Sequence, residues 1–207
     1  MKLIEKIAVF FSVAFQPLFM PFVGVLLMFL LNPVVNNTVP TESKQIAIWF
    51  TFVYTVLLPL FMFIVLYKIG WVSDVNLTVR KERIIPTFIS VLLFIGLYFQ
   101  IKGLEGMNIL LAKVFLGSVF GLLLANIITI YWKISIHSFG VFGVSGCIVA
   151  LSIFTKQPFP SALIITLLIG FIVGISRLIL KRHTPLQVLL GGLLGFLSPI
   201  VFLYFLA

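Results

Sequence analysis

Long apolar runs alternate with short polar connections along this chain of 207 residues. A helix needs about 17–25 mostly apolar residues to cross a bilayer, and only the third run is shorter than that. The pattern predicts an all-α integral membrane protein, a polytopic bundle of about six to seven transmembrane helices. The expected spans are 7–31, 46–69, 86–101, 109–131, 138–155, 161–180 and 185–206.

The first expected span contains Gln16-Pro17 and Pro21. Proline inside a helix removes a backbone hydrogen bond and clashes with the preceding turn, so we expect a kink here. In an alternative arrangement, residues 1–14 lie in the membrane interface as an amphipathic helix ahead of a shorter span.

The amino-acid composition also indicates a membrane protein and not a soluble one. The chain is 62% hydrophobic and only 9% charged, whereas soluble domains carry about 25% charged residues. We therefore expect a single membrane domain over residues 1–207, with N-terminal helices in 1–70.

The single cysteine, Cys147, excludes a disulfide framework. The net charge of +9 is typical of loops that flank membrane helices. Because no basic patch is interleaved with aromatic residues, we expect no nucleic-acid partner.

The cations are distributed unequally between the two membrane faces. Seven spans place ten lysines and arginines on the face of the N-terminus and four on the other. The positive-inside rule then puts the richer face in the cytoplasm, although cations used in catalysis would inflate the count. We expect a multi-pass protein of a bacterial cytoplasmic (inner) membrane.

Polar residues on the richer face form three clusters, RKERIIP (80–86), KISIHS (133–138) and SRLILKRHTP (176–185). Each cluster comes where a new apolar helix begins. Pro86 and Pro185 suit a first helical turn, and Thr184, Ser135 and Ser138 are candidate N-caps. Three helix N-termini would then point toward one face, with unpaired N–H groups and partial positive charge. Together with the arginines they predict a pocket for an anion, and phosphate fits it best.

The only two histidines of the chain lie in these clusters. The Arg177 guanidinium offers a planar fork for phosphate oxygens. A neutral His183 imidazole is able to attack phosphorus and form a covalent phospho-histidine. His137 is then a candidate general acid for the leaving oxygen.

The order and spacing of these clusters resemble the type-2 phosphatidic acid phosphatase superfamily. Ser176-Arg177, five residues, His183, three residues and Gln187 resemble its signature S-R-x5-H-x3-D. Ser135-Ile136-His137 resembles the signature P-S-G-H, and residues 80–86 stand where K-x6-R-P is expected. The resemblance covers about residues 75–195, which would form the catalytic core.

The resemblance implies a phosphoric ester hydrolase that acts on membrane lipid phosphates, with no metal and no cofactor. By similarity, His183 is the nucleophile and His137 the general acid. Arg177, Ser135 and the backbone after Ser135 would hold phosphate oxygens. Arg83, with Arg80 or Lys81, would supply the cations of the first signature. Arg80 is favoured over Lys81 because, in a helix, it shares a face with Arg83.

The chain departs from the signatures at several positions, of which Gln187 in place of aspartate matters most. The glutamine oxygen accepts the same hydrogen bond from His183 but brings no charge. We therefore predict an active enzyme that is slow. Glu82 and Asp74 are alternative sources of the carboxylate, although pairing of each with a neighbouring cation is the simpler interpretation.

Two further features bear on function. Gly191, Gly192 and Gly195 predict close packing of the last helix against the third or fifth span. The alternative to an enzyme is a non-catalytic carrier or binding protein for phospholipids or anions, with a degenerate phosphatase site. Transporters often carry charges deep in their spans, whereas the middles of these spans are nearly free of charge. The resemblance also implies that many relatives act on the outer face, against the charge bias.

Overall fold

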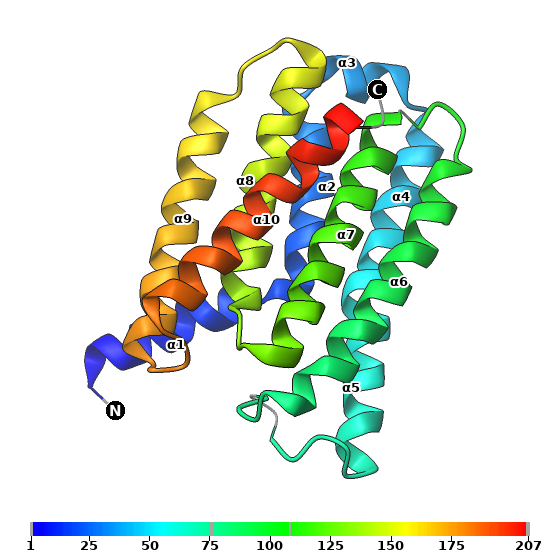
Figure 1. Cartoon of the computed structure of the whole chain (residues 1–207). Helices are drawn as coiled ribbons and strands as arrows, with labels where there is room; N and C mark the ends of the chain where they lie inside the picture. Colours follow the sequence, from blue (N-terminus) through cyan, green and yellow to red (C-terminus); the bar gives the residue numbers. More distant parts are fainter. Residues whose placement is uncertain (1, 75–76, 108, 206–207) are drawn as a thin grey trace.

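The computed structural model describes residues 2–74, 77–107 and 109–205, which form a bundle of helices (Figure 1). Residues 75 and 76 of the expected 70–85 connection, and residue 206 at the expected end of the last span, lie outside the described residues. Within the described part, seven helical segments are long and apolar enough to cross a membrane. The predicted all-α, multi-pass membrane architecture is confirmed. The segments are Leu3–Leu31, Thr41–Lys68, Lys81–Lys102, Leu111–Tyr131, Ile136–Thr155, Pro160–Ile179 and Pro185–Leu203.

The helices follow one another with short connections. In chain order they are α1 (Leu3–Ala14), the 3-10 turn η1 (Pro17–Phe19), α2 (Met20–Leu31), α3 (Pro33–Thr38), α4 (Thr41–Phe52), the π-helical turn η2 (Val53–Leu57), α5 (Leu58–Lys68), the 3-10 turn η3 (Lys81–Arg83), α6 (Ile84–Lys102), α7 (Ile109–Tyr131), α8 (Ile136–Thr155), α9 (Pro160–Ile179) and α10 (Pro185–Phe205).

The first span is broken, as the prolines predict. Helix α1 ends before Gln16, whose backbone is extended (φ −62°, ψ 134°) because a following proline disfavours helical geometry. Pro21 lies in the first turn of α2 without breaking it. Helix α1 is inclined steeply to α2 and packs against α9 (Figure 1). The break therefore turns α1 across one end of the bundle.

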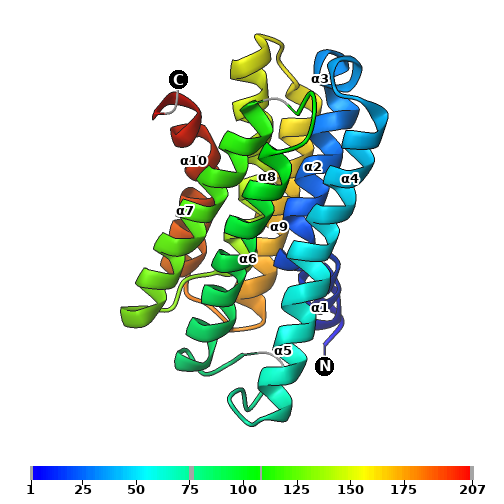
Figure 2. The same ribbon diagram turned by 90° about the vertical axis from the view of Figure 1, so that its right-hand side faces the viewer.

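Helix α8 lies at the centre of the bundle. It packs against α10, α9 and α2, while α6 packs along α7 on the other side (Figure 2). Large apolar side chains such as Leu30 and Phe61 are exposed on the outside, as expected of helices that face lipid. The third span begins earlier than predicted, because η3 continues directly into α6 and includes the charged residues ahead of Pro86.

Glycines bring α10 into backbone contact with α8. A Cβ added at Gly191 would lie 2.5 Å from the Ser135 carbonyl oxygen, and one at Gly195 would collide with the Phe139 carbonyl. The Ser135 N–H also donates to the Gln187 carbonyl over 3.2 Å. The prediction of close packing is confirmed, and the partner is the fifth span. This contact joins the start of α8, with one histidine cluster, to the start of α10, with the other.

Candidate active site

The starts of α6, α8 and α10 meet at the end of the bundle where α1 also lies (Figure 1). Ser135 is the N-cap of α8, since its Oγ accepts from the Ser138 N–H over 3.3 Å. The prediction of an N-cap was wrong for Ser138, which lies within the first turn of α8. Its hydroxyl is 2.9 Å from the Ser135 hydroxyl. Both serines are fully buried and fix the backbone ahead of His137.

The turn between α9 and α10 is a Schellman motif. The Lys181 N–H donates to the Leu178 carbonyl over 2.9 Å, and the Arg182 N–H donates to the Arg177 carbonyl over 3.1 Å. Lys181 takes the left-handed position (φ 51°) that glycine usually occupies. This turn reverses the chain, so that Arg182 and His183 return beside Arg177 at the end of α9.

The first turn of α10 is held by a capping box. The Gln187 N–H donates to Thr184 Oγ1 over 3.4 Å, and the Thr184 N–H donates to Gln187 Oε1 over 3.2 Å. This reciprocal pair is the usual role of glutamine three residues after a threonine N-cap, and it confirms Thr184 as the cap. Gln187 Oε1 also lies 3.1 Å from His183 Nδ1. One amide oxygen thus holds both the helix start and the imidazole.

These contacts determine the tautomer of His183. A backbone N–H only donates, so the Gln187 atom that faces Thr184 must be the oxygen. That oxygen only accepts, so His183 Nδ1 must carry the hydrogen, which leaves a lone pair on Nε2. His183 is 7% exposed, and its Nε2 has no hydrogen-bond partner among the described residues. The residue at 187 therefore fixes the tautomer of His183 and leaves the Nε2 lone pair free of hydrogen, although it carries no charge.

Arginines from two other elements face this imidazole. Arg83 is 8% exposed, and its Nε donates to the Leu77 carbonyl over 2.6 Å. Arg177 donates from Nη1 to Ser12 Oγ over 3.3 Å, and its buried Nε has no partner in the described part of the chain. No aspartate or glutamate is among the described residues that line the cavity at this site. The cluster is therefore strongly cationic and suited to an anion with several oxygens.

The environment keeps His183 neutral. Burial, together with the charges of Arg83, Arg177 and Lys133, lowers the pKa of His183 to about 3, although the hydrogen bond that His183 donates to Gln187 acts in the opposite direction. Burial and the same arginines, with Arg182, also lower the pKa of Lys133. A neutral imidazole is the form that attacks phosphorus, so His183 is in its nucleophilic form at neutral pH.

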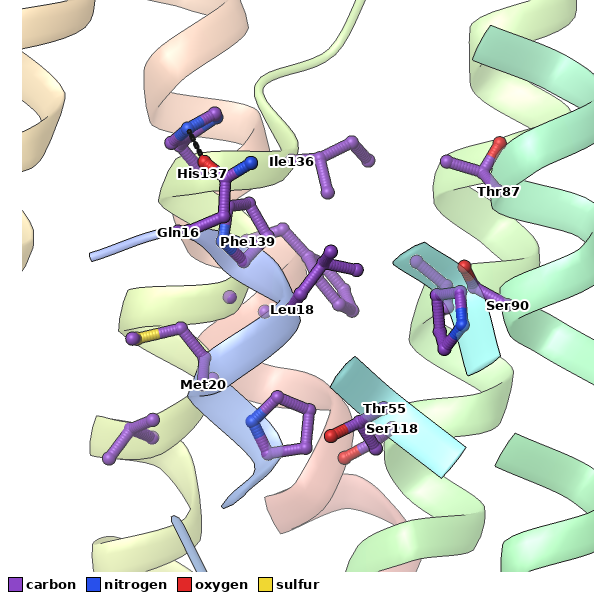
Figure 3. Close-up of a pocket in the computed structure, with 18 of the residues that line it drawn as sticks. Gln16, Leu18, Met20, Thr55, Thr87, Ser90, Ser118, Ile136, His137 and Phe139 are labelled. Carbon is purple, nitrogen blue, oxygen red and sulfur yellow. Dashed lines mark hydrogen bonds between the residues drawn. The ribbon is translucent and has the colours of Figure 1, made fainter. Parts of the chain in front are cut away.

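His137 follows the cap of α8 and lies near the break in the first span. Its Nε2 is 3.2 Å from Gln16 Oε1 (Figure 3). The second histidine is therefore held by the segment that follows α1.

Both histidines line one cavity of about 670 Å³. In Figure 3, His137 and Gln16 lie on one wall, and Thr87 and Ser90 of α6 lie across from them. Along α8 the lining runs from His137 to Cys147, about 15 Å at the rise of a helix. The charged end carries Ser12, Gln16, Arg83, His137, Arg177, Arg182 and His183, and the apolar wall includes Val25, Met28, Phe63, Phe94, Leu111, Val114, Phe115, Val144 and Cys147.

The predicted site residues separate into two groups. The cavity is lined by His183, His137, Arg177 and Arg83. Gln187 and Ser135 act on these residues from outside the lining, since Gln187 accepts from His183 Nδ1 and Ser135 caps the helix that carries His137. Arg80 and Lys81 are not among the described residues that line it, and Lys81 is exposed. The Glu82 carboxylate accepts hydrogen bonds from the Ser73 N–H and hydroxyl over 2.9 and 2.7 Å.

Three lining residues were not predicted from the sequence. Arg182, Ser12 and Gln16 line the cavity, and none of them matches a conserved letter of the three signatures. Arg182 lies in the third cluster, whereas Ser12 and Gln16 lie in the first span. Their only signal is a pair of polar residues four apart, on one face of an otherwise apolar helix. In the described part of the chain no group of three or more histidine, cysteine, aspartate or glutamate residues is placed to hold a metal ion.

Comparison with known proteins agrees with this geometry. Neither the curated protein sequences nor the solved structures gave a significant match. A family model does match the chain, over residues 132–207, which contain α8, α9 and α10 with both histidines. That model describes the PAP2 superfamily, and the residues that it matches resemble this superfamily.

Proposed function

We propose that this chain is a membrane phosphatase that hydrolyses a lipid phosphate monoester or pyrophosphate through a phospho-histidine on His183. The PAP2 superfamily generally hydrolyses phosphate esters, so the family match suggests phosphatase activity. The observation that carries the proposal is the buried Nε2 of His183, which has no partner among the described residues and is held in its nucleophilic tautomer beside Arg83 and Arg177.

The phosphate binds at the cationic end of the cavity. Arg83, Arg177 and Arg182 line this end and supply donors for its oxygens. The free Nε of Arg177 is one such donor. Hydrogen bonds from fixed guanidinium groups also stabilise the charge that develops on the phosphoryl oxygens in the transition state. The arginines thus bind the substrate and lower the barrier.

The reaction then proceeds in two steps. In the first, the His183 Nε2 lone pair forms a P–N bond as the P–O bond to the lipid breaks, and His137 gives its proton to the leaving oxygen. In the second, water attacks phosphorus and returns a proton to His137 while the P–N bond breaks. Inorganic phosphate leaves and the neutral His183 imidazole is restored. Gln187 accepts from Nδ1 throughout both steps and keeps the His183 ring in the same orientation.

The shape of the cavity favours a lipid over a soluble phosphate. Apolar side chains line it for about 15 Å beyond His137, and its volume of about 670 Å³ is within the range of ligand pockets. Val13 of α1 and Leu60 of α5 line the cavity and are 66% and 45% exposed. The cavity is therefore open on the apolar outer surface, where a lipid would enter with its chain toward α8.

We place the protein in a bacterial cytoplasmic membrane, with the site on the face that the positive-inside rule assigns to the cytoplasm. Cysteines introduced at exposed Lys81 and, on the other face, at Gln100 test this in a Cys147→Ala background. Labelling of the first only from outside the cell would contradict the cytoplasmic assignment.

The decisive experiment is phosphate release from a panel that includes phosphatidic acid, phosphatidylglycerol phosphate, polyprenyl phosphate and polyprenyl pyrophosphate. We expect release from at least one lipid, inhibition by vanadate, and loss of release in His183→Ala. Full activity of this variant would refute the assignment. Binding of these lipids without any release would instead support the carrier.

A further inference from the structure

The N-terminal helix contributes to the site although it lies outside the segment that the family model matches. Helix α1 packs along α9, and the break at Gln16-Pro17 leaves Gln16 facing the start of α8. Ser12 is 5% exposed and accepts from Arg177, while Gln16 meets His137. One short segment therefore touches an arginine of the cationic cluster and the candidate general acid.

Gln16 presents an acceptor to the His137 ring, since its Oε1 lies 3.2 Å from Nε2. An amide or carbonyl oxygen accepts only, so it favours a ring nitrogen that carries hydrogen. A ring held in this way is suited to give up a proton. Figure 3 shows the Gln16 side chain directed toward the His137 ring.

We propose that Gln16 is a positioning residue for His137. It keeps hydrogen on Nε2 and holds the ring at the cavity wall, and the leaving oxygen of the substrate replaces Gln16 Oε1 as acceptor. The proton moves from Nε2 of the His137 imidazolium to that oxygen as the P–O bond breaks, which leaves a neutral imidazole, and Gln16 accepts from Nε2 again once the ring has been reprotonated. This inference rests on the proposed phosphatase activity and adds α1 to its machinery.

Leaving-group dependence separates this role from a merely structural one. A nitrophenolate leaves without help from an acid, whereas the alkoxide of a lipid phosphate needs a proton. We expect Gln16→Ala to lower kcat for the lipid phosphate by up to about 100-fold and to leave p-nitrophenyl phosphate hydrolysis nearly unchanged. The exposed Gln100→Ala is the matched control and should alter neither substrate. Equal losses on both substrates, or none, would overturn the proposal.

A double-mutant cycle gives the second test. If Gln16 acts through His137, Gln16→Ala should cost no further activity in a His137→Ala background. Independent, additive losses would contradict the coupling. His183→Ala should abolish hydrolysis of both substrates. Activity retained in His183→Ala would count against the phosphatase mechanism itself. Failure of the proposed function is thus distinguishable from failure of the role proposed for Gln16.

Histidine NMR tests the contact without turnover. The chain has two histidines, so ¹⁵N-histidine labelling of wild type and His183→Ala identifies the His137 signals. We expect Gln16→Ala to shift the Nε2 resonance of His137, whereas Gln100→Ala should leave it in place. An unchanged resonance in Gln16→Ala would refute the proposal even if no substrate had been found.

Discussion

Gln187 offers the sharpest perturbation of the candidate site, because a single oxygen accepts two hydrogen bonds. Gln187→Leu keeps a side chain of similar size and removes that acceptor. It leaves His183 Nδ1, now 3.1 Å from the oxygen, and the Thr184 N–H, now 3.2 Å from it, without their partner. The imidazole then loses both its orientation and the preference for hydrogen on Nδ1.

The two losses differ in size. Thr184 is exposed, so water replaces the acceptor for its N–H at little cost. His183 is 7% exposed, and an unsatisfied buried donor costs about 1–3 kcal/mol. The ring avoids that cost by moving its hydrogen to Nε2, which blocks the attacking lone pair. Where an orienting carboxylate was replaced in a serine protease, the wrong tautomer cost about 10⁴ in rate. We therefore expect Gln187→Leu to lower kcat by about 10²–10⁴.

The assay is phosphate release from the preferred lipid phosphate, with kcat and KM determined separately. We expect KM to change little, because the arginines that bind phosphate are untouched. Gln187→Glu is the control, since it keeps an acceptor at the same reach. Its added charge should raise the pKa of His183 from about 3 by about 1–3, so the imidazole stays neutral at pH 7 and this variant should remain active there. A folded Gln187→Leu protein with the wild-type kcat would refute the orienting role of Gln187.

Further predictions concern protonation, packing and charge. Because burial and neighbouring cations lower the pKa of His183 to about 3, NMR titration of the free protein should find this imidazole neutral down to about pH 4, and titration near its ordinary value of about 6.5 would contradict that environment. Gly195→Ala places a Cβ against a backbone carbonyl of α8 and should destabilise the protein by about 1–3 kcal/mol in thermal unfolding, whereas Gly103→Ala, whose Cβ would make only ordinary contacts at 3.7 Å, should not. Arg182→Ala should raise KM, with a binding loss of about 1.5–3 kcal/mol, while Lys181→Ala on the exposed side of the same turn leaves KM unchanged.

The fold was predictable because a bilayer constrains it strongly. The length of each apolar run predicts a span, and Pro17 predicts the break in the first. The boundaries were less predictable at the charged end of α6, where arginine and lysine side chains extend a helix beyond its apolar part. Hydropathy does not separate a polar helical turn from a polar loop, so the start of α6 was placed too late.

The candidate site was predictable where residue type, spacing and a helix start coincide. Arg177, His183 and Gln187 lie within eleven positions of the sequence, 177–187, and one turn brings them together. Gln16 is more than a hundred positions from His137 and reaches it only through tertiary packing, in which η1 and α2 lie against α8. Arg182 faces the cavity because Lys181 adopts the left-handed conformation, which a lysine does not signal in sequence.

Trapping the phosphorylated enzyme tests the central claim most directly. Wild type would be mixed with a ³²P-labelled lipid phosphate, quenched within milliseconds and digested, and the labelled peptide identified by mass spectrometry. The mechanism predicts an acid-labile phosphoryl group on His183 that appears before free phosphate and is absent from His183→Ala. Release of phosphate without label on His183, or label that persists in His183→Ala, would contradict it.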